Sequence, residues 1–172
     1  AGELPFLSDI IEKKINLDEQ NYGDLQSEYI NYIKKFKHEE EYLVDKTPLN
    51  FKWIGFILNF FPNSKIIHCK RNSVDTCWSN YKNLFSSDKL DYSYSFSNLG
   101  NYYKLYEDLM LYWSKIYKDK FYEIDYEKLV KNKDEEIKNI LKYLDLDWDE
   151  NCLNFHKNKR SVSTASLAQI RK

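Results

Sequence analysis

The fold is decided by Lys65-Ile66-Ile67-His68-Cys69, a short apolar run between the breaker Phe61-Pro62-Asn63-Ser64 and the polar residues that begin at Lys70. Continuous apolar runs of this length are typical of strands buried in a parallel sheet. Residues 41–45 and 120–125 are predicted as further strands. Helical apolar spacing separates the three runs, and this alternation predicts an α/β fold with a mostly parallel sheet.

In the sequence, predicted helices precede and follow these strands. Thr47-Pro48 is read as a helix start, because proline is tolerated in the first turn, and Ser73 is a plausible N-cap. The aromatic and polar stretch 86–97 is predicted to be a loop. Apolar residues recur at helical spacing in segments 21–40, 50–61, 73–85, 98–118, 127–130 and 135–144. No repeat or linker interrupts the chain, so residues 1–172 are assigned to one domain.

Composition excludes several classes of protein. The 172 residues carry 26 basic and 27 acidic side chains, which argues against a nucleic-acid-binding surface. No apolar run is long enough for a transmembrane helix, so no membrane partner is expected. Three cysteines without CxxC spacing argue against disulfides and zinc, and Cys69 is read as a small core residue. A reducing, cytoplasmic location is expected.

The residues that follow the predicted strands are the candidate binding groups, because ligands bind beyond the carboxyl ends of parallel strands. These residues are Lys46, Arg71 and Tyr126. Arg71 precedes a helix N-terminus, where a guanidinium beside free backbone N–H groups makes an anion site that Ser79 could also reach. The alternatives are an Arg71 that caps a surface carboxylate, a solvated Ser79 or Lys46, and a Tyr126 ring in the core. His68 is read as a satisfied core histidine.

Several segments in order resemble the central block of sulfotransferases. They are Asp45-Lys46-Thr47-Pro48, Phe61-Pro62-Asn63-Ser64-Lys65, Arg71 with Asp75 and Ser79, Asp125-Tyr126-Glu127-Lys128-Leu129-Val130, and Ser163-Thr164-Ala165-Ser166 with Gln169-Ile170-Arg171. The chain is most similar to bacterial sulfotransferases joined to tetratricopeptide repeats, and then to tyrosylprotein sulfotransferases. The resemblance implies a three-layer P-loop NTPase-like fold and sulfonate transfer from 3'-phosphoadenosine 5'-phosphosulfate to an acceptor hydroxyl.

The resemblance also implies residue roles. Arg71 and Ser79 match the pair that binds the donor's 3'-phosphate, and Lys46 matches the lysine on the leaving group. Glu3 matches the general base, although a lone carboxylate is usually a surface group. Further donor contacts are implied at Tyr126, Ser166, Gln169 and Arg171, with Ser166 also a candidate transition-state donor. The reaction requires no metal, and the implied acceptor is a peptide tyrosine, a sugar or a small metabolite.

The chain departs from the family in one respect. The glycine-rich 5'-phosphosulfate loop is absent, and only four glycines are present. The family places that loop just before the segment that Gly2-Glu3 resembles, so we expect an N-terminal truncation that removes the first strand, and an unstable, inactive chain on its own. Two alternatives stay open: a catalytically inactive nucleotide-binding domain of the same fold, and a P-loop kinase-like enzyme.

Overall fold

The computed structural model of the protein describes residues 6–13, 22–35, 41–85, 88–154 and 157. The chain divides into two compact units, the first comprising 1–64 with 154–172 and the second comprising 65–153. No helix among the described residues is both long enough and apolar enough to cross a membrane.

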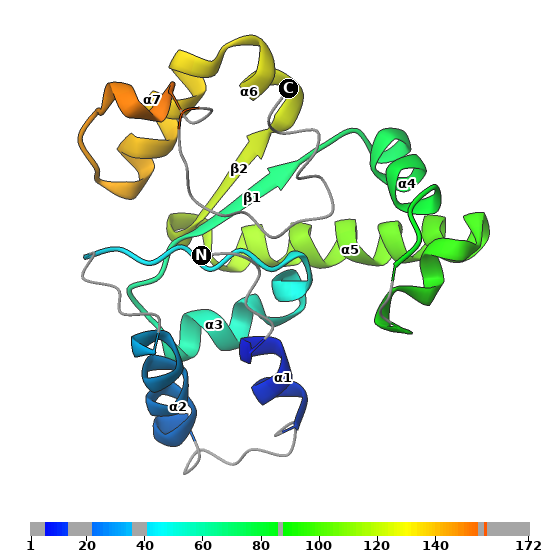
Figure 1. Cartoon of the computed structure of the whole chain (residues 1–172), viewed down its shortest axis with the longest axis horizontal. Coiled ribbons are helices and arrows are strands. Elements are labelled where there is room, and N and C mark those ends of the chain that lie inside the picture. Colours follow the sequence, from blue (N-terminus) through cyan, green and yellow to red (C-terminus); the bar gives the residue numbers. More distant parts are fainter. Residues whose placement is uncertain (1–5, 14–21, 36–40, 86–87, 155–156, 158–172) are drawn as a thin grey trace. The chain divides into compact units, whose positions relative to one another are not determined.

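The second unit is built on two parallel strands, β1 (Ile66–Lys70) and β2 (Phe121–Asp125), which lie side by side in Figure 1. The chain between the strands forms α4 (Ser73–Tyr81), η3 (Asp88–Tyr94), α5 (Phe96–Ile116) and η4 (Lys118–Lys120). After β2 it forms α6 (Tyr126–Lys131), α7 (Lys133–Leu144) and η5 (Glu150–Cys152). Helices between parallel strands are the connection that such a pair requires, and this two-stranded parallel sheet is compatible with the expected α/β class.

Alternating side chains direct the two faces of the strand pair to different helices. His68 lies opposite Glu123 in the register and contacts Tyr106 of α5. Tyr122, which precedes Glu123 on β2, stacks instead on Tyr143 of α7, with ring centroids 5.0 Å apart. Figure 1 accordingly shows α5 along one side of the strands and α7 on the other.

The end of α7 is tied to the start of β1. Asp145 caps this helix in the left-handed conformation, with φ of 59°. The Lys65 ammonium pairs with the Asp145 carboxylate and donates to the Tyr143 carbonyl at 2.7 Å. A cation suits this position because the last helix carbonyls are unpaired and carry partial negative charge.

The first unit has a core of its own, made by short helices. They are α1 (Phe6–Lys13), α2 (Tyr22–Lys34), η2 (Pro48–Trp53) and α3 (Ile54–Phe60). Their fully buried cluster consists of Leu7, Ile10, Ile11, Leu25, Tyr29 and Phe60. In α1 the buried positions 7, 10 and 11 follow the helical period, so one face of this helix supplies half of the cluster.

Several expected elements are confirmed with shifted bounds. The strands at 65–69 and 120–125 are β1 and β2, and the helices expected at 98–118 and 135–144 are α5 and α7. The helix expected at 50–61 begins as the 3-10 turn η2, and the one expected at 73–85 ends at Tyr81. Within the expected loop 86–97, the described part from Asp88 contains the 3-10 turn η3 and the start of α5.

Two expectations are wrong. Residues 41–47 form no strand, and Tyr42, Leu43 and Val44 are all exposed, because the segment has no strand partner among the described residues. Cys69 is exposed rather than a core residue. In β1 only His68 is fully buried, because among the described residues this strand has a neighbour on one edge only.

Candidate functional site

The turn after β1 brings together two of the predicted site residues. The Arg71 guanidinium carbon lies 5.5 Å from the centre of the Tyr126 ring, a cation–π distance. Arg71 follows β1 and Tyr126 follows β2, so the parallel register places both at the same end of the strand pair. Their side chains are 45% and 42% exposed respectively, which leaves the cation accessible to a ligand.

Asp125 positions Tyr126. This residue ends β2, and its carboxylate accepts a hydrogen bond from the Lys128 backbone N–H at 2.9 Å. That bond caps α6, and together with the Glu127 backbone it holds the pKa of Asp125 below its usual value. Helix α6 therefore begins directly at the strand end, and its first residue presents the ring to Arg71.

The start of α4 differs from the sequence prediction. Asn72 is the N-cap, not Ser73, and its side-chain oxygen accepts from the backbone N–H groups of Val74 at 3.0 Å and Asp75 at 3.2 Å. Asparagine and serine both cap helices well. Because α4 begins at Ser73, the N-cap position falls on Asn72. The amides of Val74 and Asp75 are thus engaged by the cap, and an anion here would meet the Arg71 side chain and the helix dipole.

Arg71 also approaches a carboxylate on α4. Its Nη2 atom lies 3.9 Å from Asp75 Oδ2, at the outer limit of an ion pair. Ser79 lies one helical turn beyond Asp75 and is half-buried; its backbone carbonyl accepts from Asn83. Asp75 therefore separates Arg71 from Ser79 along the helix, and no contact between Arg71 and Ser79 is found in the described part of the chain.

Lys46 lies in the first unit, within the extended segment 41–47 and not behind a strand. The preceding Asp45 carboxylate holds the segment: it accepts from the Tyr29 hydroxyl and from Asn50 Nδ2 at 3.4 Å. Asn50 in turn accepts from the Ser8 hydroxyl at 3.3 Å. Burial, followed by the Asp45 carboxylate, raises the pKa of Tyr29, so its phenol stays protonated and donates. The Lys46 side chain is exposed.

Four predicted site residues, Glu3, Ser166, Gln169 and Arg171, lie outside the described residues.

His68 is a satisfied core histidine, as expected. It is 8% exposed, with Nδ1 3.1 Å from Glu123 Oε2 and Nε2 bonded to the Tyr106 hydroxyl. Burial lowers its pKa, and the Glu123 carboxylate opposes that shift. Both ring nitrogens are engaged inside the unit, so His68 ties β1 to β2 and α5.

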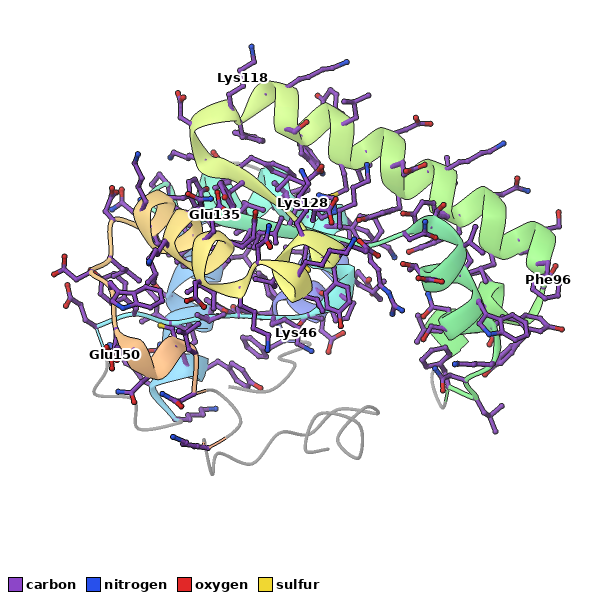
Figure 2. All side chains as sticks on the ribbon, turned by 90° about the horizontal axis from the view of Figure 1, so that it is seen from above. Lys46, Phe96, Lys118, Lys128, Glu135 and Glu150 are labelled. Carbon is purple, nitrogen blue, oxygen red and sulfur yellow. The ribbon has the colours of Figure 1, made fainter. Side chains whose placement is uncertain are left out.

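The aromatic segment 92–96 divides between core and surface. Tyr92 stacks on Tyr102 of α5 with centroids 3.8 Å apart, and Ser93 is fully buried. Phe96 begins α5, at the opposite end of this helix from Lys118 (Figure 2), and it stacks on Tyr81 at 3.9 Å while staying largely exposed. The first part of the segment therefore covers the core, and its last residue is available at the surface.

Sequence reasoning missed two residues that hold the Arg71 turn. The Tyr103 hydroxyl on α5 donates to the Arg71 carbonyl at 3.3 Å. The Asn72 backbone N–H donates to Glu127 Oε1 on α6 at 3.1 Å. In the sequence Tyr103 is one more apolar helix position, and Glu127 is a residue at a helix start. Neither pattern shows that the side chain contacts the backbone of the Arg71 turn.

Comparison with known proteins shows to which family this chain belongs. A model of the sulfotransferase family matches residues 9–150. Over 192 aligned residues the chain is 32% identical to an uncharacterized protein of Aquifex aeolicus. The alignment covers all of this chain and 25% of that protein, so the chain spans about a quarter of its relative's length. The family match includes β1, α4, β2 and α6, which carry the Arg71–Tyr126 arrangement, and the chain belongs to the sulfotransferase family.

Proposed function

We propose that the protein transfers a sulfonate group from 3'-phosphoadenosine 5'-phosphosulfate to an acceptor hydroxyl by in-line displacement. The observation that carries the proposal is the half-exposed Arg71 guanidinium on the Tyr126 ring, at the shared end of two parallel strands. A delocalised cation held on an aromatic face suits a phosphate, which it binds through two parallel hydrogen bonds.

In this proposal the donor's 3'-phosphate is bound by Arg71 and by the Ser79 hydroxyl. For Ser79 to share the anion, the Arg71 side chain has to move from Asp75 toward the ligand. The long 3.9 Å separation makes that movement easy, because an exposed ion pair contributes at most about 1 kcal/mol. Tyr126, Ser166, Gln169 and Arg171 supply the other donor contacts.

The chemical step then depends on charge placement. Lys46 neutralises the charge that builds on the oxygen leaving with the phosphate, and Ser166 donates a hydrogen bond to the sulfonate in the transition state. Glu3 takes the proton of the acceptor hydroxyl as that oxygen attacks sulfur. Sulfonate transfer resembles phosphoryl transfer, in which positioning and electrostatic stabilisation supply most of the catalysis. The acceptor is a peptide tyrosine, a sugar or a small metabolite.

The proposal includes a three-layer P-loop NTPase-like fold for the complete protein, with the first strand and the phosphosulfate loop outside this chain. Exposed apolar side chains support it: Ile67 on β1 is 41% exposed, and Tyr42, Leu43 and Val44 are exposed in the extended segment. Such surfaces are what a further strand would cover. The family match runs through both compact units, which supports a single domain over 1–172.

The test is a calorimetric titration of the complete gene product with 3'-phosphoadenosine 5'-phosphate. We expect Arg71→Ala to weaken binding about 100-fold, because it removes charge-assisted hydrogen bonds worth about 2.7 kcal/mol together. Lys82→Ala, which removes an exposed cation at the other end of α4, is the matched control and should bind like the wild type.

Four other outcomes would contradict the proposal. Equal binding by wild type and Arg71→Ala would show that Arg71 does not hold the phosphate. No binding by the folded wild type would leave family membership as shared ancestry. Nucleotide binding without sulfonate turnover would favour the inactive binding domain, and displacement of the ligand by ATP would favour the kinase-like alternative.

A further inference from the structure

One peptide unit of the β1–α4 turn is held from both sides. Its carbonyl, on Arg71, accepts the Tyr103 hydroxyl of α5 at 3.3 Å. Its N–H, on Asn72, donates to Glu127 Oε1 of α6 at 3.1 Å. The two partners are far apart in the chain and belong to different helices, so two elements meet on a single peptide group.

We call these two hydrogen bonds, from Tyr103 and to Glu127, the clamp. The clamp restricts the turn at the Arg71–Asn72 peptide, next to the Arg71 cation. A peptide group is planar, so fixing the directions of its carbonyl and its N–H also fixes the rotations on either side of it. One rotation sets how the Arg71 side chain leaves the backbone. The other sets the entry into α4, where Asn72 caps the helix. The clamp therefore restrains the direction in which the Arg71 side chain leaves the backbone and the orientation of the helix dipole behind it.

Both partners are themselves well supported. Burial raises the pKa of Tyr103, so its phenol remains a neutral donor. Its ring packs edge-on against the Tyr106 ring, with centroids 5.3 Å apart, and this ring contact does not require the Tyr106 hydroxyl. Glu127 is half-buried and directly follows Tyr126, whose ring carries the Arg71 guanidinium.

We propose that Tyr103 and Glu127 are positioning residues for the anion site at Arg71, and that they act through the Arg71–Asn72 peptide without touching the ligand. This inference rests on the proposed donor site. Glu127 is a carboxylate close to where the anion would bind. Its two possible roles therefore predict opposite changes in anion affinity when the residue is replaced. If Glu127 acted through its charge, removing that charge would strengthen anion binding. If it acts through the hydrogen bond, losing the acceptor oxygen weakens binding.

The experiment measures binding of 3'-phosphoadenosine 5'-phosphate to the complete gene product by calorimetry. We expect Glu127→Ala to weaken binding about 5- to 10-fold, which corresponds to one lost hydrogen bond. Glu127→Gln keeps an acceptor oxygen without the charge, and it should bind within about twofold of the wild type. Stronger binding by both variants would overturn the inference in favour of a purely electrostatic role.

Tyr103→Phe tests the other side of the clamp, with an expected loss of about 3- to 10-fold in affinity. Two variants of the same helix are its controls. Tyr112→Phe changes an exposed tyrosine, and Tyr106→Phe breaks the bond to His68; both should keep the wild-type affinity, and Tyr106→Phe should lower the melting temperature. Wild-type affinity in Tyr103→Phe would overturn the inference, and so would an equal loss in Tyr106→Phe, which would indicate general loosening of α5.

The same titrations distinguish a failure of the clamp from a failure of the donor site. If the wild type binds and Arg71→Ala does not, the donor site stands, and the clamp is judged on the Tyr103 and Glu127 variants alone. If the wild type and Arg71→Ala bind equally, the proposed function itself fails.

Discussion

Two segments of this chain look alike in the sequence and are held in different ways. Residues 41–45 and 65–69 are both short apolar runs with a candidate site cation after them, Lys46 directly after the first and Arg71 two positions after the second. The second run is the strand β1, paired along its length with β2. The first run is extended chain with exposed side chains, held by side-chain bonds to Asp45.

The difference shows two ways of placing a cation. Around Arg71, backbone pairing, a helix cap and the clamped peptide share the task, and most of these groups are exposed. Before Lys46, the Asp45 carboxylate accepts a hydrogen bond from the hydroxyl of Tyr29, a residue that is 6% exposed. A buried donor that loses its partner cannot turn to water, so we expect the Asp45 network to be the more sensitive of the two.

The largest expected effect is therefore at Asp45. Asp45→Ala should lower the free energy of unfolding by about 2 kcal/mol, because it leaves the buried Tyr29 hydroxyl unpaired. Asp45→Asn keeps an acceptor oxygen and should lower it by less, as should Tyr29→Phe, which removes the donor itself. Urea denaturation measures all three. A loss in Asp45→Ala no greater than that in Tyr29→Phe would show that the hydroxyl finds another partner.

A smaller effect is expected at the cap of α4. Asn72→Ala should lower the free energy of unfolding by about 1 kcal/mol, the usual value for a lost N-cap. The cost is lower than at Asp45 because Val74 and Asp75 are exposed, and water can reach their freed N–H groups. Asn72→Ser retains a capping oxygen and serves as the control in the same urea titration. A cost above that of Asp45→Ala would reverse the comparison.

The smallest effect at neutral pH is expected at His68. The folded protein holds its pKa below the ordinary value, chiefly through burial, with Lys70 adding to the shift and Glu123 opposing it. The unfolded chain, with a histidine pKa of about 6.5, then binds the proton more readily than the folded protein. The contribution of His68 to stability is complete above that pH and is lost as the pH falls below it.

The measurement for His68 is the free energy of unfolding between pH 7.5 and 5, within which the ordinary histidine pKa of about 6.5 lies. We expect His68→Gln to reduce the pH dependence, because the glutamine has no proton to bind and can still bond to Tyr106. The part of the slope that comes from the other titrating groups should be unchanged. An identical slope in the variant would mean that His68 titrates alike in the folded and unfolded chains.

Much of the architecture was predictable because it depends on local pattern. The apolar run at 65–69 predicted β1 because it is short, continuous and preceded by a breaker, and the helical spacing from 98 to 118 predicted α5. The run at 41–45 has the same local pattern as a strand, but a strand also needs a partner, and pairing is not a local property. The prediction failed there for that reason.

The candidate site divides along the same line. The sequence by itself determined that Arg71 and Tyr126 follow strands, and therefore that both lie at one end of a parallel pair. Only the tertiary structure decided that Tyr103 and Glu127 meet the same peptide, that Asn72 rather than Ser73 caps α4, and that Asp75 stands between Arg71 and Ser79. The physical reason is that apolar periodicity reports which face of an element is buried, whereas a hydrogen bond between distant residues depends on how the elements pack together.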